Sequence, residues 1–176
     1  MPGSPILNEK IAIVGCGGAG KSTLACYLGE RLGLPVYHLD AELWKPGWVM
    51  TEREEEIKII KRLAQSEAWI IDGNYGYTMP DRLKVCDAVI VLDFPTYLCL
   101  WRVVKRCWRY RGKVRPDMGE GCLEKIDVEF LRWIWGYRKK QRPRVFGYIE
   151  EHGKACRVIV LNGPREVKSF VKQMEY

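Results

Sequence analysis

The chain has 176 residues, of which 47% are hydrophobic, and no long polar or repetitive tract interrupts it. These values exclude a disordered chain and predict a single domain, residues 1–176, with a sizeable core. The most apolar window, residues 88–104, contains Asp93 and Arg102, which excludes a transmembrane helix, and residues 1–10 lack the layout of a signal peptide, so we expect a cytoplasmic protein. The net charge is +7, and the excess is local: residues 102–115 carry seven basic side chains and residues 138–144 carry five, with no acidic side chain in either segment.

Residues 11–32 predict a buried strand, a glycine-rich loop and a helix, in that order. Residues 11–14 are all apolar, as in a strand that is covered on both faces. The next residues read Gly-Cys-Gly-Gly-Ala-Gly-Lys-Ser and satisfy the pattern G-x-x-x-x-G-K-[ST] without a substitution. Leu24, Leu28 and Leu32 then follow at helical spacing. This context predicts a phosphate-binding loop and therefore a protein that binds a nucleoside triphosphate.

Each residue type in this loop has a physical role in binding phosphate. Glycine allows a positive φ and a close approach to the ligand, and the backbone amides then form an anion nest at the positive end of the following helix. We expect Lys21 to reach the β- and γ-phosphate oxygens during catalysis and the Ser22 hydroxyl to ligate Mg²⁺. ATP and Mg²⁺ are the expected cofactors. The predicted nucleotide-binding residues are Gly15, Gly17, Gly18, Ala19, Gly20, Lys21, Ser22 and Thr23.

The cysteines do not form a recognisable metal motif. Seven occur along the chain, none with C-x-x-C spacing, and only two histidines accompany them. A Cys/His zinc site is therefore not expected, and the cysteines are interpreted as reduced and mostly buried. Cys16 lies inside the loop, where it is either a small filler residue or a thiol with a depressed pKa near a helix N-terminus.

Four further apolar stretches alternate with helical ones. The predicted strands cover residues 34–39, 69–75 including a final turn, 88–93 and 157–161. Helices are predicted over about residues 51–65 with a Thr51–Glu54 capping box, 97–110, 123–139 and from 164 onward; Pro143 interrupts the third of these or starts another helix that ends by Gly153. This alternation predicts an α/β fold with a parallel sheet and helices on both faces.

Polar residues stand where the predicted strands end, at the edge of the sheet where active groups gather. Asp72 and Asp93 each follow an apolar run, and either carboxylate is a candidate for Mg²⁺; the Asp72-Gly73 turn resembles that of adenylate kinases, which favours Asp72. Asp40 ends the second strand, where kinases of the shikimate kinase type have the carboxylate that contacts the acceptor hydroxyl; the alternative is a helix N-cap. We expect the adenine contact near Asn162.

A cluster of arginines follows the fourth strand. Arg102, Arg106 and Arg109 lie on one face of the predicted helix, and Arg115 follows in a turn-rich segment. This layout is typical of a mobile lid that closes over a triphosphate, so we expect a lid over about residues 102–142 in which Arg106, Arg109 and Arg115 are catalytic. The alternative is a basic surface exposed to solvent.

Aromatic residues accompany these basic segments. Trp101, Trp108, Trp133 and Trp135 are interleaved with Lys and Arg, as on a nucleic-acid-binding surface, although tryptophans on a helix more often belong to a core. The residues expected on the acceptor side are Asp40, Trp44, Trp48, Tyr75 and Arg82.

Several stretches of the chain resemble the bacterial "DNA topology modulation protein FlaR" family. Besides the glycine loop, they are residues 36–40, 44–48, 69–75, 92–95, 100–106, 111–118 and 130–135. The resemblance implies an adenylate-kinase-like P-loop NTPase fold with three layers, a five-stranded sheet of order 2-3-1-4-5 and a helical basic lid. The name of the family implies an effect on DNA topology.

Two functional hypotheses follow. The first is ATP-Mg²⁺-dependent phosphoryl transfer to a small acceptor that is nucleoside- or nucleotide-like, or another small hydroxyl or phosphate compound. The second is a nucleotide-dependent DNA-binding protein that uses ATP as a switch. Lid arginines that point into the cleft favour the first hypothesis, and an outward basic stripe beside exposed Trp133 and Trp135 favours the second. A plain ATPase is less expected because no predicted strand ends in an Asp-Glu pair.

Overall fold

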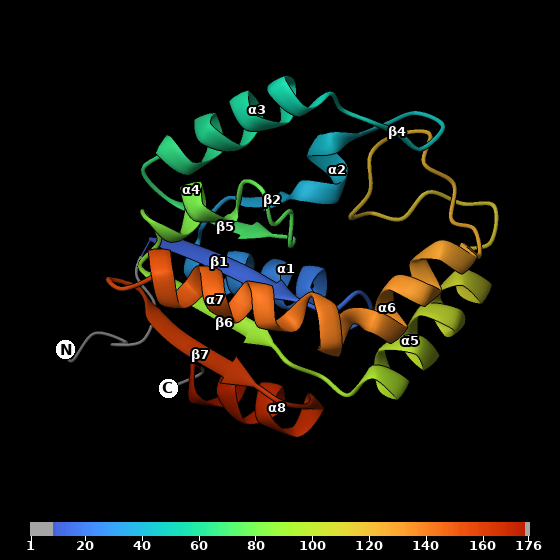
Figure 1. The fold of residues 1–176 in the computed structure, drawn as a ribbon. Coiled ribbons are helices and arrows are strands. Elements are labelled where there is room, and N and C mark those ends of the chain that lie inside the picture. Colours follow the sequence, from blue (N-terminus) through green and yellow to red (C-terminus); the bar gives the residue numbers. More distant parts are fainter. Residues whose placement is uncertain (1–8, 175–176) are drawn as a thin grey trace.

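A computed structural model describes residues 9–174. A five-stranded parallel sheet lies between layers of helices (Figure 1), so the predicted fold class is confirmed. The strands, in the order β2-β5-β1-β6-β7, read 2-3-1-4-5 when they alone are numbered along the chain. They are β1 (Lys10–Gly15), β2 (Val36–His38), β5 (Trp69–Asp72), β6 (Ala88–Leu92) and β7 (Arg157–Leu161).

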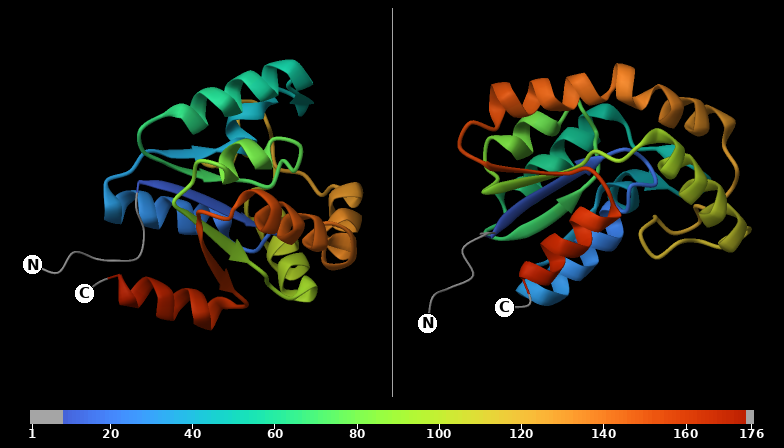
Figure 2. Two further views of the ribbon diagram at one scale, coloured as in Figure 1. Left: turned by 60° about the vertical axis from the view of Figure 1, so that its left-hand side comes forward. Right: turned by 90° about the horizontal axis from the view of Figure 1, so that it is seen from below.

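Helices cover both faces of the sheet, and two more lie beyond the ends of its strands (Figure 2). In Figure 2, α1 and α8 lie on one side of the sheet and α3, α4 and α7 on the other, while α5 and α6 lie beyond the carboxyl ends of the strands. The long helices are α1 (Lys21–Leu32), α3 (Arg53–Gln65), α5 (Thr96–Arg109), α6 (Val128–Lys140), α7 (Arg142–His152) and α8 (Pro164–Gln173). The short elements are α2 (Leu39–Leu43), β3 (Trp44–Lys45), β4 (Val49–Met50) and α4 (Met79–Leu83).

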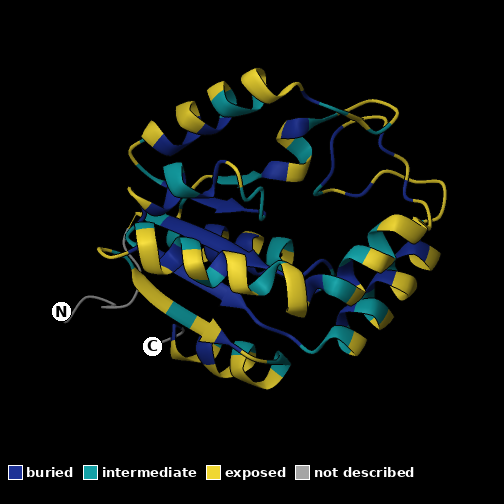
Figure 3. Ribbon diagram, in the orientation of Figure 1, coloured by how far each residue is buried: buried dark blue, intermediate teal, exposed yellow. Residues whose placement is uncertain are grey.

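Residues 11–14 of strand β1 are apolar because both faces of the strand are buried there. Ile11 and Ile13 belong to the core on the side of α1 and α8, whereas Ala12 and Val14 belong to the core beneath α3, α4 and α7. Figure 3 shows the central strands buried and the edge strand β7 largely exposed. The glycine loop at the end of β1 is therefore anchored in the centre of the molecule.

The structure corrects several predicted local features. The capping box is wrong: α3 begins at Arg53 with Glu52 at the N-cap and no side-chain cap bond, because Thr51 is buried and its N–H donates to the carbonyl of Leu43. Residues 44–48, for which no strand was predicted, belong to the β3–β4 hairpin.

Helix α6 begins later than expected because Asp127 caps it. The carboxylate of Asp127 accepts hydrogen bonds from the N–H groups of Glu129 and Phe130. Residues 110–127, the connecting segment, carry only isolated β-bridges between α5 and α6. Helix α7 starts at Arg142 with Pro143 in its first turn, as one alternative predicted. Among residues 9–174, no helix is long and apolar enough to cross a membrane.

Candidate nucleotide-binding site

The loop between β1 and α1 needs glycine for its conformation and for its packing. Gly15, Gly18 and Gly20 have φ values of 144°, 80° and 99°. A Cβ on Gly15 would lie 2.5 Å from the carbonyl oxygen of Leu92, and one on Gly18 would lie 2.5 Å from that of Cys99. Since both neighbours are backbone atoms, a side chain at either position would displace the main chain of β6 or α5.

Three side chains hold this loop in place. The Asn74 side chain accepts a hydrogen bond from the N–H of Gly15 at 3.0 Å and donates one to its carbonyl at 2.8 Å. Arg102 donates to the carbonyl of Ala19 at 3.1 Å, and the Lys21 ammonium donates to that of Cys16 at 3.1 Å. The loop is thus preorganised, with two cations bound along it. The role of Asn74 was not predicted, although its place just after the Asp72-Gly73 turn is a usable signal.

Cys16 is a buried packing residue. It is 2% exposed, and its thiol interacts with that of Cys99. This hydrogen bond and burial raise the pKa of Cys16, because a buried thiolate is poorly solvated. The alternative of a depressed pKa is therefore wrong.

Asp72 lies beside the loop and is paired with a histidine. Its Cα is in register with Ile13 on β1 and with His38 on β2. Its carboxylate oxygen Oδ1 is 2.7 Å from Nδ1 of His38, and this interaction raises the pKa of His38 although burial opposes the shift. His38 was not predicted as a site residue.

Asp93 is occupied by a different partner. Nε and Nη2 of Arg142 both lie 2.8 Å from its Oδ2 atom, and Nη2 of Arg138 lies 3.8 Å from the same oxygen. The pairing raises the pKa of Arg142 and ties the start of α7 to the end of β6. Neither arginine was a predicted site residue, but both lie in the basic segment 138–144. Within the described part of the chain, Asp93 forms salt bridges with two arginines, whereas the salt bridge of Asp72 is with His38.

The residues at the loop fit a Mg²⁺ ion that takes most of its ligands from phosphate and water. Within residues 9–174, no group of three or more His, Cys, Asp or Glu side chains could hold a metal alone. Mg²⁺ in phosphoryl-transfer sites commonly takes one or two protein ligands. The half-buried Ser22 in the first turn of α1 and the carboxylate of Asp72 match that donor set.

Asp40 and Tyr75 meet on the acceptor side. Asp40 lies within α2, whose N-cap is His38, so the N-cap alternative for Asp40 is wrong. The exposed Asp40 carboxylate accepts a hydrogen bond from the Tyr75 hydroxyl at 2.7 Å. Burial and the Asp40 charge raise the pKa of Tyr75, which therefore remains a hydrogen-bond donor. The structure thus brings together two residues predicted for this side.

The two tryptophans that were predicted on the acceptor side, Trp44 and Trp48, are both half-buried. Trp44 and Trp48 contact each other edge to face, with centroids 5.7 Å apart. The indole N–H of Trp48 donates to the carbonyl of Leu123 at 2.8 Å. Trp48 therefore fastens the connecting segment to the β3–β4 hairpin, as the hydrogen bond from the N–H of Gly47 to the carbonyl of Gly121 also does.

Arg82 does not contact the site surface, contrary to the prediction. Its side chain is fully buried, and its guanidinium donates to the carbonyls of Gly73 and Asn74. Burial lowers the pKa of Arg82 to about 10. Arg82 thus stabilises the turn at Gly73 and Asn74, and the Asn74 side chain in turn binds Gly15 of the loop. Arg82 therefore affects the site indirectly, through the position of this turn.

The predicted lid arginines are not brought together at the loop. Nε of Arg115 lies 2.6 Å and Nε of Arg106 lies 3.3 Å from Oε2 of Glu124, and Arg115 also contacts Asp117 at 3.1 Å. Burial and the neighbouring Arg115 lower the pKa of Arg106. Arg109 is exposed. In this structure a carboxylate of the connecting segment pairs with two of the three arginines, and their catalytic role stays a prediction.

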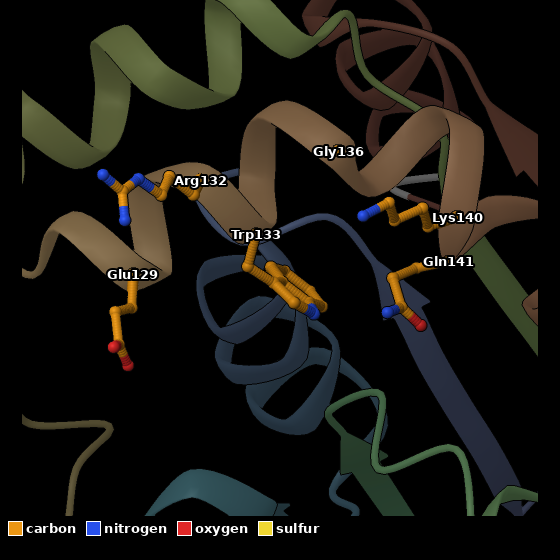
Figure 4. A pocket seen from close by; sticks show the side chains of 6 residues that line it. All are labelled: Glu129, Arg132, Trp133, Gly136, Lys140 and Gln141. Carbon is orange, nitrogen blue, oxygen red and sulfur yellow. The ribbon is translucent and has the colours of Figure 1, made fainter.

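Two cavities lie beside α6. The larger, of about 400 Å³, is shown in Figure 4, where Trp133 and Gln141 point toward the same space. The second, of about 280 Å³, shares these two residues and reaches Asn74. Trp133 stacks on Phe130 at 5.8 Å, and Phe130 packs against Gly17 of the loop. The second cavity therefore borders Asn74, the residue whose side chain is bonded to Gly15 of the loop.

No protein-family model matches the sequence, and no match was found among curated proteins. Among solved structures, the chain is similar to a shikimate kinase from Acinetobacter baumannii in complex with shikimate, with a TM-score of 0.60, 19% identity, and coverage of 98% of this chain and 92% of that chain. It is also similar to shikimate kinases from Bacteroides thetaiotaomicron (TM-score 0.53, 17% identity, 95% and 96% coverage) and Aquifex aeolicus (TM-score 0.50, 18% identity, 94% and 93% coverage). At these identities the likeness establishes the fold alone, and the chain therefore has the α/β fold of these shikimate kinases.

Proposed function

We propose that the protein is an ATP- and Mg²⁺-dependent phosphotransferase that acts on a small-molecule acceptor. The acceptor is nucleoside- or nucleotide-like, or another small compound with a hydroxyl or phosphate group. One observation carries this proposal: the glycine loop is held in shape by Asn74 and Arg102, with the Lys21 ammonium bound across it. A preorganised loop of this kind, at a helix N-terminus, is suited to a polyphosphate.

The neighbouring residues have matching roles in this proposal. Lys21 and Arg102 counter the negative charge on the β- and γ-phosphates. Ser22 and Asp72 would hold Mg²⁺ beside the phosphates, where the ion would supply further charge neutralisation. Asp40 accepts the proton of the acceptor hydroxyl, and the hydrogen bond from Tyr75 orients its carboxylate.

The cavity that is lined by Asn74 and by residues of α6 and α7 provides the space for the acceptor. Residues 102–142 act as a lid, the adenine lies near Asn162 and Gly163, and the protein works in the cytoplasm. The chain is a member of the FlaR-like family in this proposal, which the similar stretches between residues 36 and 135 support.

The test is a screen of phosphoryl acceptors with ATP-Mg²⁺, in which ADP release is measured. We expect at least one acceptor to stimulate ADP release, and Lys21→Ala to reduce the stimulated rate by about 100-fold or more. The matched control is Lys58→Ala, which removes an exposed lysine of α3 and should leave the rate unchanged. An absence of stimulation across a broad metabolite panel, or a fully active Lys21→Ala variant, would contradict the proposal.

The alternative is a nucleotide-dependent DNA-binding protein, which one surface feature favours. Helix α5 exposes Tyr97, Trp101 and Trp108, at 74%, 58% and 81% exposure, beside Lys105 and Arg109. Exposed aromatic rings and cations are suited to single-stranded nucleic acid. A salt titration with a DNA oligonucleotide distinguishes this alternative, because binding through several phosphates falls steeply as salt rises.

A further inference from the structure

Two cysteines from distant parts of the chain lie close together at the N-terminal ends of the strands, whereas the glycine loop lies at the carboxyl ends. Cys86 lies just before β6 and Cys156 just before β7, and the first residues of these strands, Ala88 and Arg157, are paired. The two Sγ atoms are 3.0 Å apart. A disulfide bond is about 2.05 Å long, so a movement of about 1 Å, within reach of side-chain rotation, would close it.

No other pair among the seven cysteines, all of which lie within the described residues, combines contact with access. Cys16 and Cys99 also interact through their thiols, but they are 2% and 0% exposed. The other three thiols contact groups that are not cysteines: Cys26 contacts His38, Cys107 contacts Glu124, and Cys122 contacts the carbonyl of Lys45.

The two thiols of the pair differ in accessibility. Cys156 is partly exposed, whereas Cys86 is buried. Both thiols contact the carbonyl oxygen of Leu83, at 3.7 Å from Cys86 and 3.2 Å from Cys156, which holds the two sulfurs on the same side of α4. A reagent from solution therefore reaches Cys156 first, and Cys86 is in position to displace it.

We propose that Cys86 and Cys156 form a thiol pair that a small-molecule disulfide, such as oxidised glutathione, converts into an intramolecular disulfide. The Cys156 thiolate attacks one sulfur of the small disulfide, and one molecule of small thiol leaves. The Cys86 thiolate then attacks the Cys156 sulfur of the mixed disulfide, and the second molecule of small thiol leaves. The two protons of the protein thiols end on the two released thiols, and two electrons pass from the protein to the small disulfide.

The new bond would join the end of α4 to the connection between α7 and β7. It closes a loop over residues 86–156 that contains α5, α6 and α7. Cross-linking residues so far apart restricts the unfolded chain and stabilises the folded one. Because the bond lies at the opposite end of the strands from Lys21, it leaves the nucleotide site in place.

The test is peptide mapping of the full-length protein after exposure to oxidised glutathione. Free thiols are blocked with N-ethylmaleimide, the protein is digested, and the peptides are identified by mass spectrometry. We expect a linked pair of peptides containing Cys86 and Cys156, which dithiothreitol separates. We also expect the midpoint of thermal unfolding to rise by about 5 °C or more in the oxidised protein.

Two variants make the result decisive. Cys156→Ser should abolish the linked peptides and the thermal shift, while Cys26→Ser, which removes an exposed thiol, should retain both. Modification of Cys26 by glutathione without any Cys86–Cys156 link would overturn the proposal, since the oxidant would then have been active. A thermal shift that persists in Cys156→Ser would overturn the proposed cause of the stabilisation.

Discussion

Glu124 offers the most direct test of how the connecting segment is held. Its carboxylate lies 2.6 Å from Nε of Arg115 and 3.3 Å from Nε of Arg106, and its side chain is only 3% exposed. Glu124→Gln keeps the shape of the side chain and removes its charge. The two guanidinium groups would then share a buried site without their common counter-charge.

The expected magnitude follows from the burial of the partners. Removing one partner from a buried ion pair typically costs about 3–5 kcal/mol. The Arg115 side chain is 8% exposed and that of Arg106 is 24% exposed, so water can partly solvate Arg106. We therefore expect Glu124→Gln to lower the free energy of unfolding by about 2–4 kcal/mol.

The assay is urea denaturation followed by tryptophan fluorescence. Trp48 is a suitable reporter because its indole is bonded to the carbonyl of Leu123, next to Glu124. Limited proteolysis should also cut the connecting segment faster in the variant. The control is Lys45→Gln, which breaks a surface pair with Glu55 whose side chains are 51% and 53% exposed; the expected change is within about 0.5 kcal/mol. Equal losses in the two variants would refute the reasoning, because burial would then make no difference.

Two further predictions concern the loop and the strand end beside it. Gly18→Ala should destabilise the protein by about 1–3 kcal/mol and weaken ATP binding, because the φ of Gly18 is +80° and the new Cβ would lie 2.5 Å from the Cys99 carbonyl oxygen. The control is Gly147→Ala in helix α7, where the new Cβ would have no neighbour within 4 Å. This variant should stabilise the protein by roughly 0.5–1 kcal/mol. Equilibrium unfolding of both variants would contradict this if the changes had the same sign. The pKa of His38 is raised above 6.5 by Asp72, so without nucleotide or metal the pair should stabilise the fold fully below pH 6.5 and lose this contribution as pH rises through the raised pKa. The measurement is the difference in unfolding free energy between wild type and His38→Gln across that range, and a difference that grows with pH would count against the pairing.

Local sequence was sufficient to predict the α/β fold class and the segment of strand, glycine loop and helix. Residues 11–14 are apolar without interruption because β1 is covered on both faces. An uninterrupted apolar run of this kind predicts such a strand from the sequence alone. The glycines at positions 15, 18 and 20 are separately required by their positive φ values, which a short pattern can express. The strand, loop and helix in this order are set by neighbours in sequence.

Side-chain partners could not be predicted in the same way. The choice between Asp72 and Asp93 depended on Arg142, which is 49 residues from Asp93. The helical spacing of Arg106 was correct, but spacing does not reveal that Glu124 lies beneath it. Arginine is a residue type that often binds substrates, but the side chain of Arg82 is fully buried inside the protein.

The sequence by itself determined the five strands of the parallel sheet and most of the long helices, and where a polyphosphate is expected to bind, because these depend on backbone preferences and burial along short stretches of chain. Only the tertiary structure decided which charges neutralise each other and which remain near the loop. The physical reason is that an ionisable side chain takes its role from burial and from its nearest opposite charge, and in a parallel sheet with helical crossovers that charge usually comes from a distant part of the chain.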